Sequence, residues 1–447
     1  MEALIKSWGI MISRRGLLSY FVQVQNVALQ LIISIFLAKL LGPESYGLYA
    51  FTFTIVSIFY ILHGNLINNM TVRYGAKYLA EKKIRELKGL LVFGISLTVI
   101  YGILLSIMIY GGLTTANLEE RGALRRGLLF VACLSIITFP LMSYVGSVLR
   151  VLDQGIIGQI PEYLIRPWVF IALALAAYLM TPVSLDVKDL LAYQSFAALI
   201  AFLMGVGFLY RKKEALDGGL GKKYYIQAWC KAAVPFLLMG GVMLVNTKAD
   251  MVMLGLLSHP EIAGAYKVAL SFAGVVGLSL TSGNLYLSPK VSALHETGMK
   301  NELQSLLNKF STWTFFIALV ASIVFLLAGE YTLEMLFGGD YSNSYRVLCI
   351  LIIGQLINAF FGPVGMVLSM TGNQGFAARI AGVAAAINVL MNLIMIPKFG
   401  GEGAAVSTAI TLFIWNSLMY RFVTKKLNVD PSIIWRLKPE ALRLWSK

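Results

Sequence analysis

The stretch PESYGLY at residues 43–49 returns as PEIAGAY at residues 260–266, a shared pattern P-E-x-x-G-x-Y at an offset of 217 residues. Proline and glycine break a helix and tyrosine favours a membrane interface, so the pattern predicts a tight turn between two membrane helices. Two further matches keep nearly the same offset: VGSVL at 145–149 with VGMVL at 364–368, and DQG at 153–155 with NQG at 373–375. Three matches in one order indicate an internal duplication, which decides the architecture.

The composition around these repeats is that of a membrane protein. Hydrophobic residues make up 58% of the 447 residues, charged residues only 13%, and the mean hydropathy is +0.76. Because about a quarter of the residues in a soluble domain are charged, the composition excludes a soluble enzyme and a disordered chain. The formal charge of +15 lies in short segments between apolar runs, not in a basic domain that would bind nucleic acid. We expect neither a disulfide framework nor a zinc site from Cys133, Cys230 and Cys349.

Twelve apolar runs are long enough, at about 20 residues, to cross the hydrocarbon core as helices. They cover residues 16–41, 44–68, 89–111, 122–149, 158–180, 189–210, 231–257, 262–289, 310–329, 344–369, 375–396 and 402–423. Lys and Arg concentrate on the cytoplasmic side of membrane proteins. With both termini in the cytoplasm, the inner segments hold 27 of the 37 basic residues and the outer loops hold six. The sequence therefore predicts a multi-pass protein of the cell (inner, cytoplasmic) membrane with both termini in the cytoplasm.

The duplication maps the first six runs onto the last six. Because six is even, both halves enter from the same side, as parallel repeats. We expect an all-α membrane protein whose twelve transmembrane helices form two parallel six-helix lobes, an inward- or outward-open V. The expected parts are an N-terminal lobe at 1–210, a cytoplasmic basic linker at 211–230, a C-terminal lobe at 231–423 and a cytoplasmic basic tail at 424–447.

Three stretches resemble a known transporter family. They are LAKLLGPESYG at 37–47, Asn246 to Asp250 followed by AGAY at 263–266, and NVLMNLIMIP at 388–397 followed by Gly400 to Ala405. In order and spacing they resemble the polysaccharide transporter (O-antigen flippase) branch of the multidrug/oligosaccharidyl-lipid/polysaccharide exporter superfamily, over nearly the whole chain. The resemblance implies a flippase of polysaccharide or lipopolysaccharide biosynthesis, which moves polyprenyl-diphosphate-linked oligosaccharide from the cytoplasmic to the outer leaflet by alternating access.

Four basic residues fall inside predicted spans: Lys39, Arg166, Lys248 and Lys267. Because an ionisable side chain in a span costs about 2.5–3.5 kcal/mol, each is a functional hypothesis, and we expect them to attract the anionic diphosphate. The amides Gln23, Asn26 and Gln30 recur at helical spacing on the first span, where they would hold sugar hydroxyls or cement helix packing.

Structural alternatives stay open for these charges. Lys39 lies close to the outer end of its span and would reach the headgroups. Glu162 stands four residues before Arg166, so a local ion pair is the alternative there. Asp250 and Lys267 lie at similar depth on neighbouring spans, and an ion pair across that hairpin is the alternative for both.

Asp250 also lies at the depth of Asn388, Asn392 and Thr408, and oxygen ligands of this kind suit a hard cation such as Na⁺. Some members of the family that this chain resembles place a cation site on helices seven, eleven and twelve. A structural amide contact between helices is the alternative. No Walker motif is present, so hydrolysis of ATP is not indicated. We expect no bound cofactor, with coupling to Na⁺ or H⁺ left open, and a monomer whose partners are the lipid-linked oligosaccharide and membrane lipids.

Two other functions remain as alternatives to the flippase. A cation-coupled multidrug antiporter of the same superfamily needs acidic residues in its cavity, whereas basic residues outnumber acidic ones within these spans. A polytopic membrane glycosyltransferase or polymerase needs paired carboxylates in an outer loop. Glu119 with Glu120, and Asp186 with Asp189, are the candidates for that pair, but their loops are only about ten residues long. We therefore expect a transporter and not an enzyme.

Overall fold

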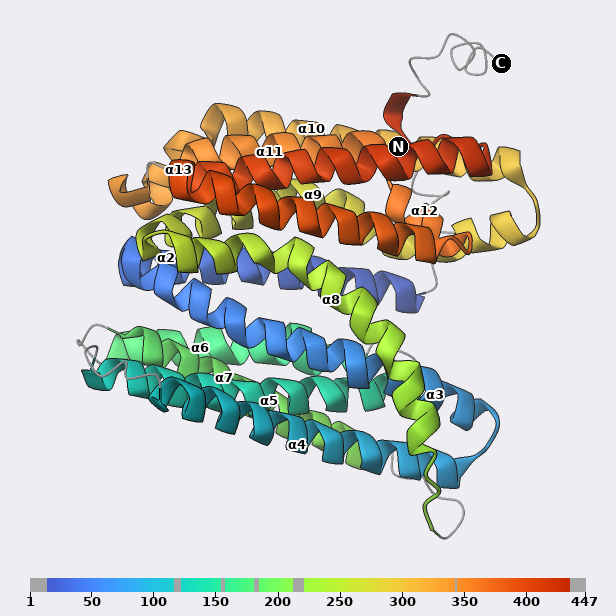
Figure 1. The fold of residues 1–447 in the computed structure, drawn as a ribbon, viewed down its shortest axis with the longest axis horizontal. Helices are drawn as coiled ribbons and strands as arrows, with labels where there is room; N and C mark the ends of the chain where they lie inside the picture. Colours follow the sequence, from blue (N-terminus) through green and yellow to red (C-terminus); the bar gives the residue numbers. More distant parts are fainter. Residues whose placement is uncertain are drawn as a thin grey trace. The chain divides into compact units, whose positions relative to one another are not determined.

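A computed structural model of the protein describes residues 14–115, 122–153, 157–180, 185–211, 221–341 and 344–434. Every secondary-structure element in these residues is helical, and ten helices are long and apolar enough to cross a membrane (Figure 1). Two of the ten, α2 (Arg14–His63) and α13 (Gln374–Phe422), each contain a bend that separates two crossing segments. Eleven of the twelve predicted runs lie on helical segments, and the run at 344–369 is divided at Gly362 and Pro363 into two helices, Ser344–Phe361 and Val364–Met370. The all-α membrane fold is thus confirmed.

Glycines make the two bends. Gly42 in α2 has φ 71° and ψ 173°, and Gly400 in α13 has φ 54° and ψ −127°. L-residues with a side chain rarely adopt these backbone angles, whereas glycine does so at little cost. The bends fall where the sequence predicts turns between spans, the first directly before the duplicated pattern at Pro43. Glycine therefore lets one continuous helical segment leave the membrane and return.

The chain forms two compact units. The first contains Met1–Leu29 and Thr52–Leu244, and the second contains Gln30–Phe51 and Val245–Lys447. Both α2 and α8 (Ile226–Leu257) therefore contribute to both units. The lobe limits drawn from the sequence stay a prediction.

The first unit is organised around α5. Besides parts of α2 and α8, its elements are η1 (Gly64–Asn68), α3 (Asn69–Ala80), α4 (Ile84–Thr115), α5 (Gly122–Asp153), η3 (Ile157–Gln159), η4 (Pro161–Ile165), α6 (Arg166–Met180) and α7 (Val187–Tyr210). α5 packs against α4 and α7, with Ile136, Phe139 and Met142 buried in the core between them. Large apolar side chains on α4, such as Leu104 and Ile107, are exposed, as expected of a surface that faces lipid.

The second unit is organised around α11. Besides parts of α2 and α8, its elements are α9 (Pro260–Glu296), α10 (Lys300–Phe337), η6 (Gly339–Tyr341), α11 (Ser344–Phe361), α12 (Val364–Met370), α13 and η7 (Val423–Leu427). α11 packs against α9, α10 and α13. α10 begins ten residues before the predicted run at 310–329, because hydropathy marks only the apolar part of a helix.

The two copies of the duplicated pattern pack against each other within the second unit. A Cβ atom on Gly47 would lie 1.8 Å from the carbonyl oxygen of Pro260, and one on Gly264 would lie 2.3 Å from that of Pro43. Each glycine therefore faces the proline of the other copy, and only hydrogen atoms fit between the two backbones. The reciprocal contact is what a duplicated turn gives when its copies are related by a two-fold axis.

This contact predicts that Gly264→Ala destabilises the protein. The added methyl group meets backbone, which cannot swing aside as a side chain does, so we expect a loss of about 1–3 kcal/mol. Gly274→Ala is the matched control, because it lies on the same helix with nothing within 4 Å of the new Cβ atom. Thermal unfolding of the purified protein in detergent should show a lower Tm for Gly264→Ala alone, and equal values for the two variants would contradict the close packing.

Candidate functional site

A cluster of polar side chains around Asp250 joins three helices of the second unit. The Asp250 carboxylate of α8 accepts hydrogen bonds from Tyr266 Oη of α9 at 2.7 Å and from Asn392 Nδ2 of α13 at 2.7 Å. It also accepts one from Thr408 Oγ1, beyond the bend of α13. Asn392 Nδ2 lies 3.1 Å from Asn388 Oδ1. The structure thus brings together the four residues that the sequence analysis grouped by depth, and it adds Tyr266.

The donor set of this cluster suits a hard monovalent cation. Its oxygens come from one carboxylate, two amides and two hydroxyls, and the buried Asn392 Oδ1 has no hydrogen-bond partner in the structure. A buried oxygen left without a donor is the kind of atom that a cation would satisfy. Among the described residues no group of three or more His, Cys, Asp or Glu residues comes together, so the chain offers no ligand set typical of a transition metal there.

Lys248 and Lys267 lie on α8 and α9 of the same unit and are half-buried. Their ammonium groups interact with each other electrostatically, and like charges repel. Within the part of the chain that the structure describes, neither lysine has a carboxylate at ion-pair distance. The Asp250–Lys267 pair considered from sequence is thus not formed, because Asp250 is engaged by Tyr266 instead. Two positive charges therefore have no counter-ion among the described residues.

The other two basic residues in predicted spans differ from this pair. Lys39 is exposed on α2, as expected of a side chain that reaches toward headgroups. Arg166 of the first unit donates from Nη1 to Gln194 Oε1 at 3.1 Å, and its guanidinium lies 5.3 Å from the ring centre of Phe139. The Glu162–Arg166 ion pair considered from sequence does not form between these described side chains, because Glu162 accepts a hydrogen bond from Tyr60.

The predicted amides of α2 have different surroundings. Asn26 is half-buried and its Oδ1 has no hydrogen-bond partner, whereas Gln30 is exposed. The side chain of Gln23 lies outside the part that the structure describes. An unpaired buried oxygen at Asn26 leaves room for a hydroxyl donor.

Of the carboxylates considered for glycosyl transfer, Asp186 and Asp189 cap a helix. Asp186 Oδ1 accepts from Val187 N at 2.7 Å, and Asp186 N donates to Asp189 Oδ2 at 3.2 Å. Together they form a capping box that satisfies backbone donors at the start of α7. Glu119 and Glu120 lie outside the described residues.

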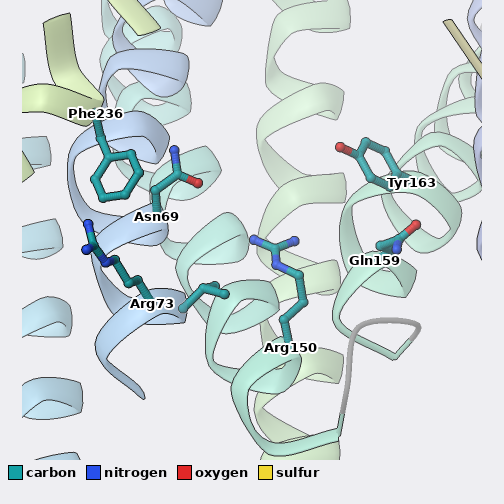
Figure 2. Close-up of a pocket in the computed structure, with 7 residues that line it drawn as sticks. Asn69, Arg73, Arg150, Gln159, Tyr163 and Phe236 are labelled. Carbon is teal, nitrogen blue, oxygen red and sulfur yellow. The ribbon is translucent and has the colours of Figure 1, made fainter. Parts of the chain in front are cut away.

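An open pocket of about 580 Å³ lies in the first unit and carries two arginines that the sequence analysis did not single out. Its lining includes Asn69, Arg73, Arg150, Gln159, Tyr163 and Phe236 (Figure 2). Figure 2 shows the Arg150 guanidinium reaching into the space between the Asn69 side and the Tyr163 side. In the sequence both arginines belong to predicted cytoplasmic segments. Basic residues are common there because of membrane topology, so their presence does not by itself indicate a binding site.

Comparison with known proteins identifies the family. The family model described as "Polysaccharide biosynthesis protein" matches residues 13–283, more than half of the chain, and the one described as "Lipid II flippase MurJ" matches residues 273–444. The chain belongs to the polysaccharide biosynthesis protein family, in the polysaccharide transporter branch of the multidrug/oligosaccharidyl-lipid/polysaccharide exporter superfamily. This confirms the resemblance noted in the sequence.

One curated relative and two solved structures show how far the similarity extends. The probable low-salt glycan biosynthesis flippase Agl15 of Haloferax volcanii is 22% identical over 180 residues, which are 40% of this chain and 38% of that protein. The chain thus spans less than half the length of this relative.

A multidrug resistance transporter of the MATE family in an inward-facing conformation is 12% identical with TM-score 0.75, covering 90% of this chain and 94% of its own. Lipid II flippase MurJ in an inward closed conformation is 15% identical with TM-score 0.71, covering 91% and 87%. At these identities the structures establish the fold alone, that of a multi-pass membrane protein.

Proposed function

We propose that this protein is a flippase that carries oligosaccharide linked to a polyprenyl diphosphate from the cytoplasmic to the outer leaflet of the cell membrane. The observation that carries the proposal is the pair Lys248 and Lys267, two positive charges on membrane-spanning helices without a carboxylate partner among the described residues. Membership of a polysaccharide biosynthesis family supports it, as does the similarity to a relative named as a glycan biosynthesis flippase.

The lysine pair suits a diphosphate for an electrostatic reason. Two unit charges of opposite sign 4 Å apart attract by about 4 kcal/mol at the effective dielectric of a protein surface, and more where water is excluded. A bound diphosphate would also remove the repulsion between Lys248 and Lys267. The polyprenyl tail would stay in lipid, and the amides of Asn26 and Gln30 would hydrogen-bond the sugars. Arg166 belongs to the first unit and donates to Gln194, so it would have to leave that partner to contact the cargo.

The Asp250 cluster is proposed as the site that couples transport to a cation. Asp250, Asn388, Asn392 and Thr408 would hold Na⁺ through oxygen atoms, and the ion would supply the free energy of its gradient across the membrane. A proton on the carboxylate is the alternative. Because α13 carries residues of the cluster on both sides of its bend at Gly400, occupation would tie the two segments of that helix together.

The remaining proposals concern organisation. Both termini lie in the cytoplasm, and the protein acts as a monomer. Two six-helix lobes, at 1–210 and 231–423, expose the site to each side of the membrane in turn. A basic linker at 211–230 joins the lobes, and a basic tail follows from residue 424. They rest on the positive charges of the predicted inner segments and on the parallel duplication.

A cation-coupled multidrug antiporter is the second candidate, because a MATE transporter shares the fold. Its cationic cargo would meet Lys248 and Lys267, which have no carboxylate at ion-pair distance among the described residues. The charge of the described spans therefore favours an anionic cargo.

Deletion of the gene in its host should leave lipid-linked oligosaccharide in the cytoplasmic leaflet. The reason is that a headgroup with two charges and several sugars crosses the hydrocarbon core too slowly without a carrier. Leaflet-resolved detection, for example by an impermeant probe added to intact cells and to inverted vesicles, measures the distribution. An unchanged distribution together with a raised sensitivity to cationic drugs would overturn the flippase in favour of the antiporter.

A further inference from the structure

The pocket of Figure 2 is lined by residues of the first unit alone, whereas Lys248, Lys267 and the Asp250 cluster belong to the second unit. It is built where the last turns of α5 meet α3, η3, η4 and α8. Arg73 and Arg150 belong to the segments 69–88 and 150–157, both predicted to be cytoplasmic from their positive charge. On this predicted topology the pocket opens on the cytoplasmic side, where the proposed cargo would be loaded.

The described residues that line the pocket carry two positive charges and no carboxylate. Neither arginine forms an ion pair or a hydrogen bond with another described residue. The guanidinium of Arg73 lies over the ring of Phe236, 5.9 Å from its centre, a contact that leaves the N–H groups at the guanidinium edge unused. Each guanidinium offers five N–H donors in a plane, the arrangement that binds phosphate oxygens in pairs.

The position of Arg150 is fixed by the backbone around it. A Cβ atom on Gly158 would lie 2.4 Å from both Arg150 Cγ and the carbonyl oxygen of Gly146, and 2.8 Å from Arg150 N. Because Gly158 has no side chain, η3 packs directly on α5 and presses on the stem of Arg150. The stem of Arg150 thus packs on the backbone of η3, and Figure 2 shows its guanidinium pointing into the pocket.

The rest of the lining suits a polar headgroup on an anion. Tyr163 and Asn69 contribute a hydroxyl and an amide, and Tyr163 lies within electrostatic reach of Arg150. The volume of about 580 Å³ falls within the usual range of about 300–1,000 Å³ for small-molecule sites. A diphosphate with its first sugar fits that range, whereas an extended glycan does not.

We infer that this pocket is a second anion site, which binds the diphosphate of the lipid carrier at the cytoplasmic surface. The inference rests on the proposed function for the identity of the cargo. Arg73 and Arg150 bind the phosphate oxygens, and Tyr163 and Asn69 bind the proximal sugar. Lys248 and Lys267 form a separate site in the second unit, so the cargo has one anion site in each unit.

Two lipids carry phosphate that could fill this pocket: the diphosphate carrier and an anionic phospholipid. The pocket lining holds two arginines, which favours the diphosphate, because a diphosphate holds two phosphate groups where a phosphodiester headgroup such as that of phosphatidylglycerol holds one. The experiment separates the two sources by competition.

Binding of radiolabelled farnesyl diphosphate to the full-length protein in phosphatidylcholine nanodiscs tests the inference. A Lys248→Gln/Lys267→Gln background removes the other anion site, so that any remaining binding reports on the pocket. In that background, adding Arg73→Gln and Arg150→Gln should weaken binding about ten- to a hundredfold, because two charge-assisted contacts are lost. Arg73→Gln alone, a change at an exposed residue that leaves the core intact, should weaken binding about tenfold.

The matched control is Lys77→Gln/Lys82→Gln, which removes two exposed positive charges from the same predicted cytoplasmic segment outside the pocket. If the control and the arginine variant lost the same amount of farnesyl diphosphate binding, the binding would be due to general surface charge, and the proposed site would be overturned. Farnesyl diphosphate binding that is unchanged by Arg73→Gln and Arg150→Gln would overturn it as well.

Phosphatidylglycerol added to the nanodiscs at the concentration of the probe should leave binding unchanged; displacement would assign the pocket to membrane phospholipid. The proposed function fails by a different result, an unchanged leaflet distribution after deletion, and that result leaves the binding data standing.

Discussion

Lys248→Gln/Lys267→Gln should lower export of lipid-linked oligosaccharide about a hundredfold or more while the protein folds and accumulates normally. Each lysine that contacts the diphosphate contributes about 1.5–3 kcal/mol, and the two losses together exceed a factor of a hundred. Stability should not fall, because the substitution removes two half-buried like charges that repel each other and have no described carboxylate partner. Leaflet-resolved detection of the glycan lipid measures export, and Tm in detergent measures stability.

Two further variants distinguish the loss of the positive charges at Lys248 and Lys267 from a general disturbance of the structure. Lys398→Gln removes an exposed positive charge from the same unit and should export as the unchanged protein does. Lys248→Arg/Lys267→Arg keeps both charges and should retain part of the activity, because guanidinium groups also bind phosphate. Full export by the glutamine variant would remove the lysine pair from the mechanism, whatever its stability.

The crossing helices follow from hydropathy because the membrane imposes a length on them. About 20 apolar residues are needed per crossing, so each run at 16–41 or 310–329 is visible without any knowledge of packing. The ends are less visible. α10 starts at Lys300 because its first turns lie beyond the hydrocarbon, where polar residues form helix equally well. The bend at Gly42 was visible as a turn because glycine and proline stand together there.

The Asp250 cluster could be grouped from sequence because depth along a helix follows from residue number at about 1.5 Å per residue. Depth could not decide between Tyr266 and Lys267 as the partner on α9. Consecutive residues point about 100° apart around a helix, so the choice depends on how the helix is rotated against its neighbours. The structure gives that rotation, and it turns Tyr266 toward Asp250.

The arginine pocket could be predicted from the sequence even less than the Asp250 cluster. Arg73 and Arg150 lie on different helices. In the sequence each belongs to a predicted cytoplasmic segment, where positive charge is expected from membrane topology alone. What brings Arg150 into a pocket is the close packing of Gly146 and Gly158, a contact between segments that hydropathy does not register. Side-chain convergence of this kind depends on tertiary packing and has no signature in the local sequence.

Substitutions of Asp250 should have two separable effects. Asp250→Ala leaves Tyr266 Oη and Thr408 Oγ1 without their acceptor, and each buried donor without a partner costs about 1–3 kcal/mol. Asn392 Nδ2 loses one of its two acceptors and keeps Asn388 Oδ1. We therefore expect a large fall in Tm and little folded protein. Asp250→Asn keeps the shape and one carbonyl acceptor but removes the negative charge, so it should fold with a modest loss.

The proposed cation site is tested by the sodium dependence of Tm. A ligand that binds only the folded state stabilises it by about 2.7 kcal/mol at a hundred times its Kd, so the unchanged protein should melt at a higher temperature in NaCl than in choline chloride at equal ionic strength. Asp250→Asn should lose that difference, since a neutral amide replaces the one carboxylate of the ligand set. Glu261→Gln, an exposed carboxylate at the start of α9, is the control and should keep it. A sodium effect that survives in Asp250→Asn would place the cation elsewhere and leave the cluster as a structural contact between α8, α9 and α13.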